Sequence, residues 1–256
     1  MPFNGAWING LFKIIKYMEL FNKKDFLSLN ESRSTELSEE DAIKLLKKNC
    51  DIDYCLKYPI YRGTTDNKEF KFIDPKLHNR TSANTANYYT MILDNSPLWV
   101  DFPERSQSII CSTYNYYAGS FGTKYRVFPY KEAKFGICPN MDFWNCFAKV
   151  TKKLDNIDSL DLGDFNTYLE DEYHLTRKDS YEEIKTKLQA ANIWDIITKE
   201  ILIPDQRPDY FLSLDYYGKD MQSLFDNNKI SNNEIWTDSK CILVKSDNLT
   251  YILDNI

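Results

Sequence analysis

The irregular order in which strands and helices are predicted constrains the fold of this chain more than any single motif does. Five short β-type runs are Pro59–Gly63, Ser108–Thr113, Tyr125–Pro129, Glu234–Thr237 and Cys241–Val244. Helical patterns are predicted at 87–93, 142–154, 164–171 and 181–200. Because these elements do not alternate in a βαβ rhythm, the sequence predicts an α+β fold with mostly antiparallel strands.

Two helix starts carry capping signals. Ser38 precedes Glu-Glu-Asp41 and predicts a helix that ends near Asn49, and Ser180 with Glu183 forms a second capping box. Residues 30–38 are predicted to form a linker. A turn around Asp238 is predicted to join the β-type runs Glu234–Thr237 and Cys241–Val244, and residues 250–253 are predicted to form another strand. The amphipathic pattern of residues 11–21 predicts a helix that docks on the body; a membrane-surface helix is the alternative.

The length of 256 residues suits one large domain with a helical lead-in. We expect an N-terminal helical segment over residues 1–55 and a single domain over 56–256. The apolar share of 43% is enough to fill a core, and the aromatic share of 15% is high.

Charge and cysteine usage exclude several classes of protein. The net charge of −6 lacks the basic excess of a duplex-DNA-binding protein. No apolar run is long enough to span a membrane. The six cysteines are scattered and only two histidines are present, so we expect no zinc or other metal site. Reduced thiols in a cytoplasm are the expected state.

Three separate features carry candidate chemistry, and each also has a structural explanation. Arg62 lies in a β-type run before Gly63, where it either binds an anion or is solvated on an edge strand. Ser112 and Thr113 end a strand, where they either bind a ligand or cap the helix that follows. Glu234 begins a late strand, either projecting into a cleft or solvated.

An aromatic run follows the Ser-Thr pair. Its rings are Tyr114, Tyr116, Tyr117 and Phe121. They either form a flat wall for a planar ligand or pack in the core.

Together, Tyr61-Arg62-Gly63, Ser112-Thr113 and Glu234 resemble the arginine–serine–glutamate order of the toxin-like mono-ADP-ribosyltransferase family. The stretch from Pro59 to Pro129 is also similar to uncharacterised proteins of tailed phages. The resemblance covers roughly Tyr58 to Val244. It implies two packed, mostly antiparallel sheets with an NAD cleft between them, and makes residues 56–256 the catalytic domain.

The resemblance also implies a role for each residue. Arg62, beside Gly63, would hold the NAD pyrophosphate or ribose, and Ser112 with Thr113 would hold the nicotinamide ribose. Glu234 would stabilise positive charge as nicotinamide leaves, while Tyr117 or Phe121 would stack on the nicotinamide ring. NAD would be the co-substrate, with no metal. The acceptor would be a host protein or nucleic acid, and we expect a monomer.

Two positions depart from the family pattern. Asn232 stands where arginine-modifying members have a second acidic residue, which favours an acceptor other than arginine. Tyr114 stands where many members have a second serine.

Two other functions stay open. One is an enzyme with Cys111 as nucleophile and His78 or His174 as base. The other is a non-catalytic phage interaction or nucleic-acid-binding protein that uses its aromatic surface, with Arg105, Lys124 and Arg126 as a basic cluster.

Overall fold

The structure is a computed structural model that describes residues 34–77, 87–147, 162–176, 179–198 and 211–249. Within these ranges, nine strands form one sheet in the order β1-β3-β9-β5-β2-β4-β8-β6-β7, and all the neighbouring pairs are antiparallel. The strands are β1 (Thr35–Glu36), β2 (Tyr61–Thr64), β3 (Phe70–Ile73), β4 (Ile109–Ser112), β5 (Thr123–Pro129), β6 (Lys134–Ile137), β7 (Leu212–Asp215), β8 (Glu234–Thr237) and β9 (Cys241–Lys245).

The fold class is therefore α+β with a mostly antiparallel sheet, but the expected division into two sheets is wrong. One sheet runs through all nine strands because β2 pairs with β4. That junction is narrow: its register contains a single residue pair, Tyr61 with Ser112, whereas β2 and β5 share four pairs. The sheet thus has two wide halves, β1-β3-β9-β5-β2 and β4-β8-β6-β7, joined at one point.

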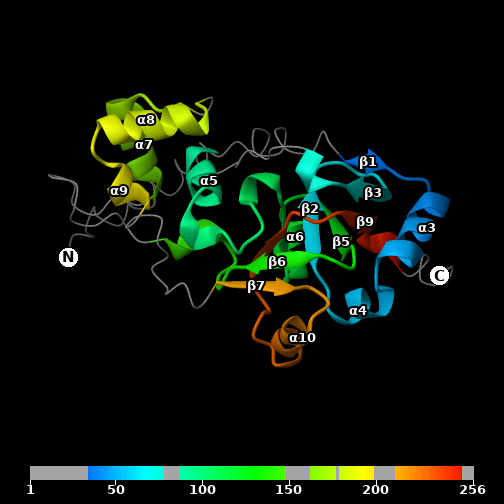
Figure 1. Cartoon of the computed structure of the whole chain (residues 1–256). Coiled ribbons are helices and arrows are strands. Elements are labelled where there is room, and N and C mark those ends of the chain that lie inside the picture. Colours follow the sequence, from blue (N-terminus) through cyan, green and yellow to red (C-terminus); the bar gives the residue numbers. More distant parts are fainter. Residues whose placement is uncertain (1–33, 78–86, 148–161, 177–178, 199–210, 250–256) are drawn as a thin grey trace, which may run out of the picture.

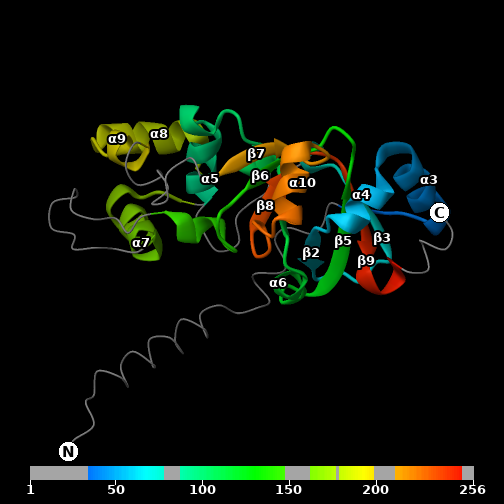
Figure 2. The same ribbon diagram turned by 90° about the horizontal axis from the view of Figure 1, so that it is seen from below.

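The helices gather at several places around the sheet (Figures 1 and 2). They are α3 (Glu39–Asn49), α4 (Ile52–Lys57), α5 (Asn87–Asp94), α6 (Asn115–Gly119), α7 (Leu162–Tyr173), α8 (Tyr181–Ala190), α9 (Trp194–Ile196) and α10 (Lys219–Asp226). Figure 1 shows α7, α8 and α9 at the end of the molecule opposite to α3 and β1.

Two hydrophobic cores hold these elements together. The main core joins the strands to α3, α4 and α10 through residues such as Leu46, Cys55 and Met221. The second core joins α5, α7, α8 and α9 to Trp236 of β8. Since α3 and α4 belong to the main core, the N-terminal helices that are described pack directly on the sheet. The domain boundary at residue 55 stays a prediction.

Several predicted helices are confirmed. Helix α3 ends at Asn49, and the Ser38 side chain accepts a hydrogen bond from Asp41 N, as the capping signal indicates. Helix α5 covers the pattern at 87–93 and α7 covers the one at 164–171. The expected helix at 11–21 and the strand at 250–253 lie outside the described residues.

Two predicted helices are corrected. The pattern at 181–200 gives α8, with its full capping box, and then a separate short α9. Asn192 lies between them at φ 58°, a left-handed conformation that ends helices. At 142–154 the described part is only the 3₁₀ turn η4 (Phe143–Cys146), flanked by extended residues.

Each of the five predicted β-type runs overlaps a strand of the structure, but the sequence did not predict which strands pair with each other. Strands β8 and β9 follow each other along the chain, yet β8 lies between β4 and β6 whereas β9 lies between β3 and β5. The predicted linker at 30–38 contains β1. No individual helix or strand was predicted at α4, β3, β6, β7 or α10.

The described ranges contain no helix that is long and apolar enough to cross a membrane.

Candidate functional site

Strands β2, β4 and β8 are neighbours in the sheet, so the strands that carry Arg62, Ser112 and Glu234 lie side by side. Ser112 is the direct register partner of Glu234, and Tyr61, the residue before Arg62, is the register partner of Ser112. The three motifs are separated by 50 and 122 positions along the chain, and the sheet brings them to one place.

Ser112 and Glu234 also share a face of the sheet. Side chains alternate along a strand, and in β8 Ile235 belongs to the main core whereas Trp236 belongs to the second core. Glu234 therefore lies on the face of Trp236, and its antiparallel partner Ser112 projects to that same face. Ser112 is 5% exposed and Glu234 is 9% exposed, so the pair is nearly enclosed.

Arg62 lies one residue beyond the point where β2 meets β4. Its Nη1 donates a hydrogen bond to the carbonyl oxygen of Ile110 on β4 at 2.6 Å. The guanidinium thus bridges the two strands where they share a single residue pair. The register places Tyr61, not Arg62, on the face of Ser112.

Gly63 is required by the packing of α6. A Cβ atom at Gly63 would lie 1.9 Å from the carbonyl oxygen of Ala118 and 2.9 Å from Cβ of Phe121. The glycine therefore lets α6 lie directly on β2. This contact places the aromatic residues of α6 and of the turn that follows it beside the junction of β2 and β4.

The hydroxyl groups after β4 have structural partners in this structure. Ser112 Oγ accepts a hydrogen bond from Tyr114 N at 3.0 Å. Tyr114 is the N-cap residue of α6, and the helix has no side-chain cap hydrogen bond, so the predicted capping role of Ser112 and Thr113 is not confirmed. Thr113 Oγ1 accepts a hydrogen bond from Asn233 N at 2.9 Å and so fixes the residue before Glu234.

The carboxylate of Glu234 is held from two sides. Oε2 accepts a hydrogen bond from Phe143 N at 3.1 Å. Oε1 lies 2.8 Å from Nη1 of Arg105 in a buried ion pair. The two groups are not oriented for a hydrogen bond, so neither atom has a hydrogen-bond partner. A carboxylate oxygen can accept two hydrogen bonds, so both oxygens keep acceptor capacity.

Arg105 was not foreseen as part of this site. It is 3% exposed, and its guanidinium carbon lies 3.7 Å from the centre of the Phe143 ring and 5.0 Å from that of Trp236. The sequence signal was weak, because an arginine in the loop Pro103-Glu-Arg-Ser106 is typical of a solvated surface.

The predicted basic cluster of Arg105, Lys124 and Arg126 does not form a basic patch on the protein surface. Arg126 is 6% exposed, and its Nη2 donates to the carbonyl oxygens of Cys55 and Leu56, each at 2.7 Å. With Arg105 also buried, two of the three cations in that cluster face the protein interior.

The aromatic run divides into a half-buried part, Tyr117 and Phe121, and an exposed part, Tyr114 and Tyr116. Burial, together with the nearby carboxylates of Asp142 and Glu234, raises the pKa of Tyr117 to about 12, and its ring packs edge-on against Phe121. Tyr116 is 77% exposed, and Tyr114 is also exposed. Tyr117 therefore lies on the Glu234 side of α6 with Phe121 packed against it, whereas Tyr114 and Tyr116 face solvent.

Cys111 does not have the surroundings of a nucleophile. It lies in the main core at 4% exposure, and burial raises the pKa of its thiol to about 12. Reactive cysteines need a lowered pKa and access to solvent. His174 is exposed, and His78 lies outside the described residues.

In the described part of the chain, no group of three or more histidine, cysteine or acidic side chains is placed to hold a metal ion. No family model matches the chain, and no curated protein or solved structure matches it either.

Proposed function

We propose that this chain is an NAD-dependent ADP-ribosyltransferase in which Glu234 is the catalytic carboxylate. The observation that carries the proposal is the direct pairing of Ser112 with Glu234 on one face of the sheet, beside the strand of Arg62. Along the chain, the three residues follow the arginine–serine–glutamate order of the family resemblance.

The reaction breaks the glycosidic bond between nicotinamide and the ribose of NAD. Nicotinamide leaves with the bonding electron pair, positive charge develops on the ribose, and an acceptor atom then bonds to the ribose carbon and loses a proton. Glu234 accepts a hydrogen bond from a ribose hydroxyl and stabilises that charge. Its second oxygen stays fixed by Phe143 N, which orients the carboxylate.

The remaining residues of the site assist in binding. Ser112 Oγ lies opposite Glu234 and bonds the nicotinamide ribose. To hold the pyrophosphate, Arg62 would have to leave the carbonyl oxygen of Ile110 and reach around the junction of β2 and β4, because its side chain projects to the face opposite Ser112 and Glu234. Tyr117 and Phe121 offer ring faces and edges to nicotinamide.

Substitution of the glutamate tests this proposal. In Glu234→Gln we expect nicotinamide release from NAD to fall about 10²–10³-fold, because a preorganised charge is lost at the reacting centre. Chromatographic measurement of free nicotinamide gives the rate, and thermal unfolding shows that the variant stays folded. The control Glu132→Gln changes an exposed glutamate and should keep full activity. Nicotinamide release at the wild-type rate from folded Glu234→Gln would remove Glu234 from the mechanism.

A non-catalytic binding protein is the second candidate. The exposed rings of Tyr114 and Tyr116, with centroids 6.1 Å apart, favour it because exposed aromatics stack on unpaired bases. Labelled NAD incubated with the protein and a host lysate separates the two functions. Transfer of label to protein or nucleic acid supports the transferase. If the wild type neither releases nicotinamide nor transfers label, but binds single-stranded nucleic acid through Tyr116, the binding function holds instead.

A further inference from the structure

Two cysteines of the second core lie next to each other beside Glu234. Sγ of Cys138 and Sγ of Cys146 are 3.3 Å apart, and both residues are free thiols. Cys138 follows β6, and Cys146 ends the turn η4. A disulfide needs about 2.05 Å between its sulfur atoms, so this pair is within about 1.3 Å of bonding distance.

The other four cysteines have different surroundings. In Cys50, Cys55 and Cys241 the thiol has an oxygen atom as its hydrogen-bond partner, and Cys111 lies in the main core. The close approach of two sulfur atoms therefore distinguishes Cys138 and Cys146 from the other thiols of the described chain.

The two thiols of the pair differ in how easily they ionise. A hydrogen bond from Cys138 lowers the pKa of the Cys146 thiol below its ordinary value, whereas burial raises the pKa of Cys138. The thiolate is the form of cysteine that reacts with oxidants. Cys146 is thus the thiol that reacts first, and Cys138 lies next to it to close the bond.

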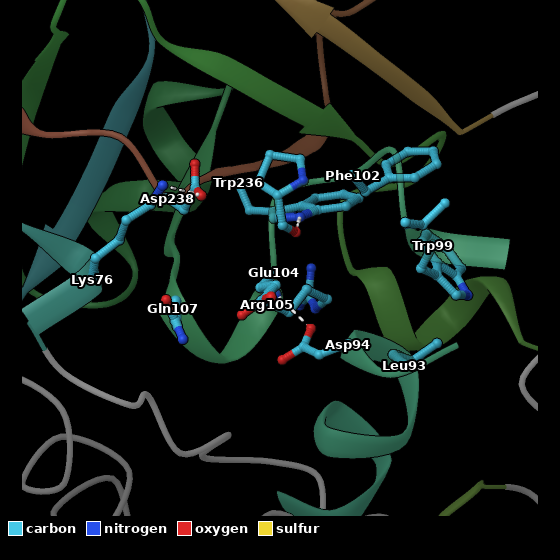
Figure 3. A pocket seen from close by; sticks show the side chains of 12 residues that line it. Lys76, Leu93, Asp94, Trp99, Phe102, Glu104, Arg105, Gln107, Trp236 and Asp238 are labelled. Carbon is cyan, nitrogen blue, oxygen red and sulfur yellow. Dashed lines mark hydrogen bonds and ion pairs between the residues drawn. The ribbon is translucent and has the colours of Figure 1, made fainter. Parts of the chain in front are cut away.

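The pair is buried, so an oxidant has to enter. Cys138 is 0% exposed and Cys146 is 1% exposed. The pocket of about 290 Å³ beside Arg105, which Figure 3 shows, offers no route, because neither cysteine lines it. Entry therefore requires a local opening of the chain around one of the two cysteines.

The turn η4 is the element that opens most easily here. It is a single 3₁₀ turn, its residue Asn145 is exposed, and its last hydrogen bond, from Phe147 N to Trp144 O, is 3.5 Å long. Local opening of such a turn costs far less free energy than global unfolding. It brings Cys146 to solvent, where a small oxidant meets it.

The segment between the two cysteines also holds Glu234. Cys138 N donates to the carbonyl oxygen of Glu234 at 2.9 Å, and Cys138 O accepts from Asn233 Nδ2 at 2.8 Å. Phe143 N donates to the carboxylate of Glu234 at 3.1 Å. A bond between Cys138 and Cys146 therefore closes a loop that contains the backbone groups that orient this glutamate.

We propose that Cys138 and Cys146 are a redox-modification site that a peroxide converts into a disulfide. The Cys146 thiolate attacks one oxygen of hydrogen peroxide and forms a sulfenic acid, while the hydroxide that leaves takes up a proton and becomes water. The Cys138 thiol then attacks the sulfur of the sulfenic acid and loses its proton, and a second water leaves. In total, two thiols lose two electrons and two protons, and the peroxide is reduced to two water molecules.

Peptide mass spectrometry of the full chain detects this bond. Trypsin cuts after Lys134 and Lys149, so the peptide 135–149 contains both cysteines of the pair and no other. After peroxide treatment, and alkylation of the remaining thiols in denaturant, we expect this peptide unalkylated and two hydrogen atoms lighter than its reduced form. Dithiothreitol should reverse the change. Oxidation of the exposed Met141 in the same peptide adds an oxygen atom and is told apart by mass.

The other cysteines and matched serine variants locate the reaction. We expect the pair to escape alkylation at least ~10-fold faster than Cys111 does, because Cys111 has neither a lowered pKa nor a sulfur partner. Cys138→Ser should stop at the sulfenic acid, which dimedone traps on Cys146. The control Cys241→Ser removes another buried thiol and should form the disulfide like the wild type.

Thermal unfolding shows what the bond does to the folded chain. Closing a loop of about nine residues should raise the Tm of the oxidised wild type by roughly 5–10 °C, and dithiothreitol should remove the gain. The oxidised Cys138→Ser variant should show no such gain.

The proposal is overturned if the pair stays open to alkylation at a peroxide dose that oxidises Met141, or if it reacts no faster than Cys111. A fall in Tm on oxidation would overturn it as well, because the bond would then form only by distorting the fold. If Cys138→Ser does not fold, the wild-type peptide map and the comparison with Cys111 still decide. No measurement uses NAD, so a failed transferase proposal leaves this one intact.

Discussion

Arg105 and Glu234 form a buried ion pair whose side chains are only 4% and 11% exposed. Burying two charges costs several kcal/mol each, and their attraction compensates only when both partners are present. The ring faces of Phe143 and Trp236 contribute cation–π attraction to the arginine. The orientation of Glu234 thus depends on Arg105, which is 129 positions away in the sequence.

A double-mutant cycle measures this dependence. We expect Arg105→Met and Glu234→Met each to lower the free energy of unfolding by about 3–5 kcal/mol, because each leaves an uncompensated buried charge. The double variant should lose clearly less than the sum, with a coupling energy of about 1–3 kcal/mol. Urea denaturation of the four proteins gives the values. Strict additivity would show that the two side chains do not interact in solution.

At the scale of elements, helix starts were predictable and pairing partners were not. The caps at Ser38 and Ser180 act within three residues, so the sequence contains the whole interaction. The end of α8 was missed because Asn192 adopts a left-handed conformation that the apolar periodicity does not report.

The contact between α6 and β2 gives a prediction at this scale. We expect Gly63→Ala to lower the free energy of unfolding by about 1–3 kcal/mol, since the new methyl group meets the backbone oxygen of Ala118, which cannot turn away. Thermal or urea unfolding measures the loss.

Gly119 in α6 is the matched control. No atom lies within 4 Å of a Cβ built at Gly119, so Gly119→Ala should be neutral or stabilise the protein by up to about 1 kcal/mol. Equal effects of the two substitutions would contradict the close approach of α6 to β2.

At the scale of the whole molecule, the sheet consists of two halves that meet at Tyr61 and Ser112. The half with β5 and β9 belongs to the main core, and Trp236 of β8 links the other half to the second core. Trp236 is fully buried, and its Nε1 donates to Pro103 O at 2.8 Å. The candidate site lies at the joint between the halves.

Native-state hydrogen exchange tests this architecture. We expect amides in the five-pair ladder of β5 and β9 to exchange only through global unfolding, because they are paired along their length and covered by the core. Amides of β2 and β4 that face the junction should exchange through smaller openings and hence faster. Mass spectrometry of peptides resolves the two groups, and uniform protection across β2, β4, β5 and β9 would argue against a weak joint.

The sequence by itself determined the class of fold, the helices whose caps are local, and the identity of Arg62, Ser112 and Glu234 as candidates. The fold class and the caps follow from patterns and interactions between residues that are close along the chain, whereas the three candidates rest on their residue types and on the order that resembles the mono-ADP-ribosyltransferase family. Only the tertiary structure decided that Ser112 opposes Glu234, that Arg105 holds the carboxylate, and that one sheet replaces the expected two. Antiparallel pairing and burial join residues more than a hundred positions apart, and no local pattern records which partner a strand or a buried charge will meet.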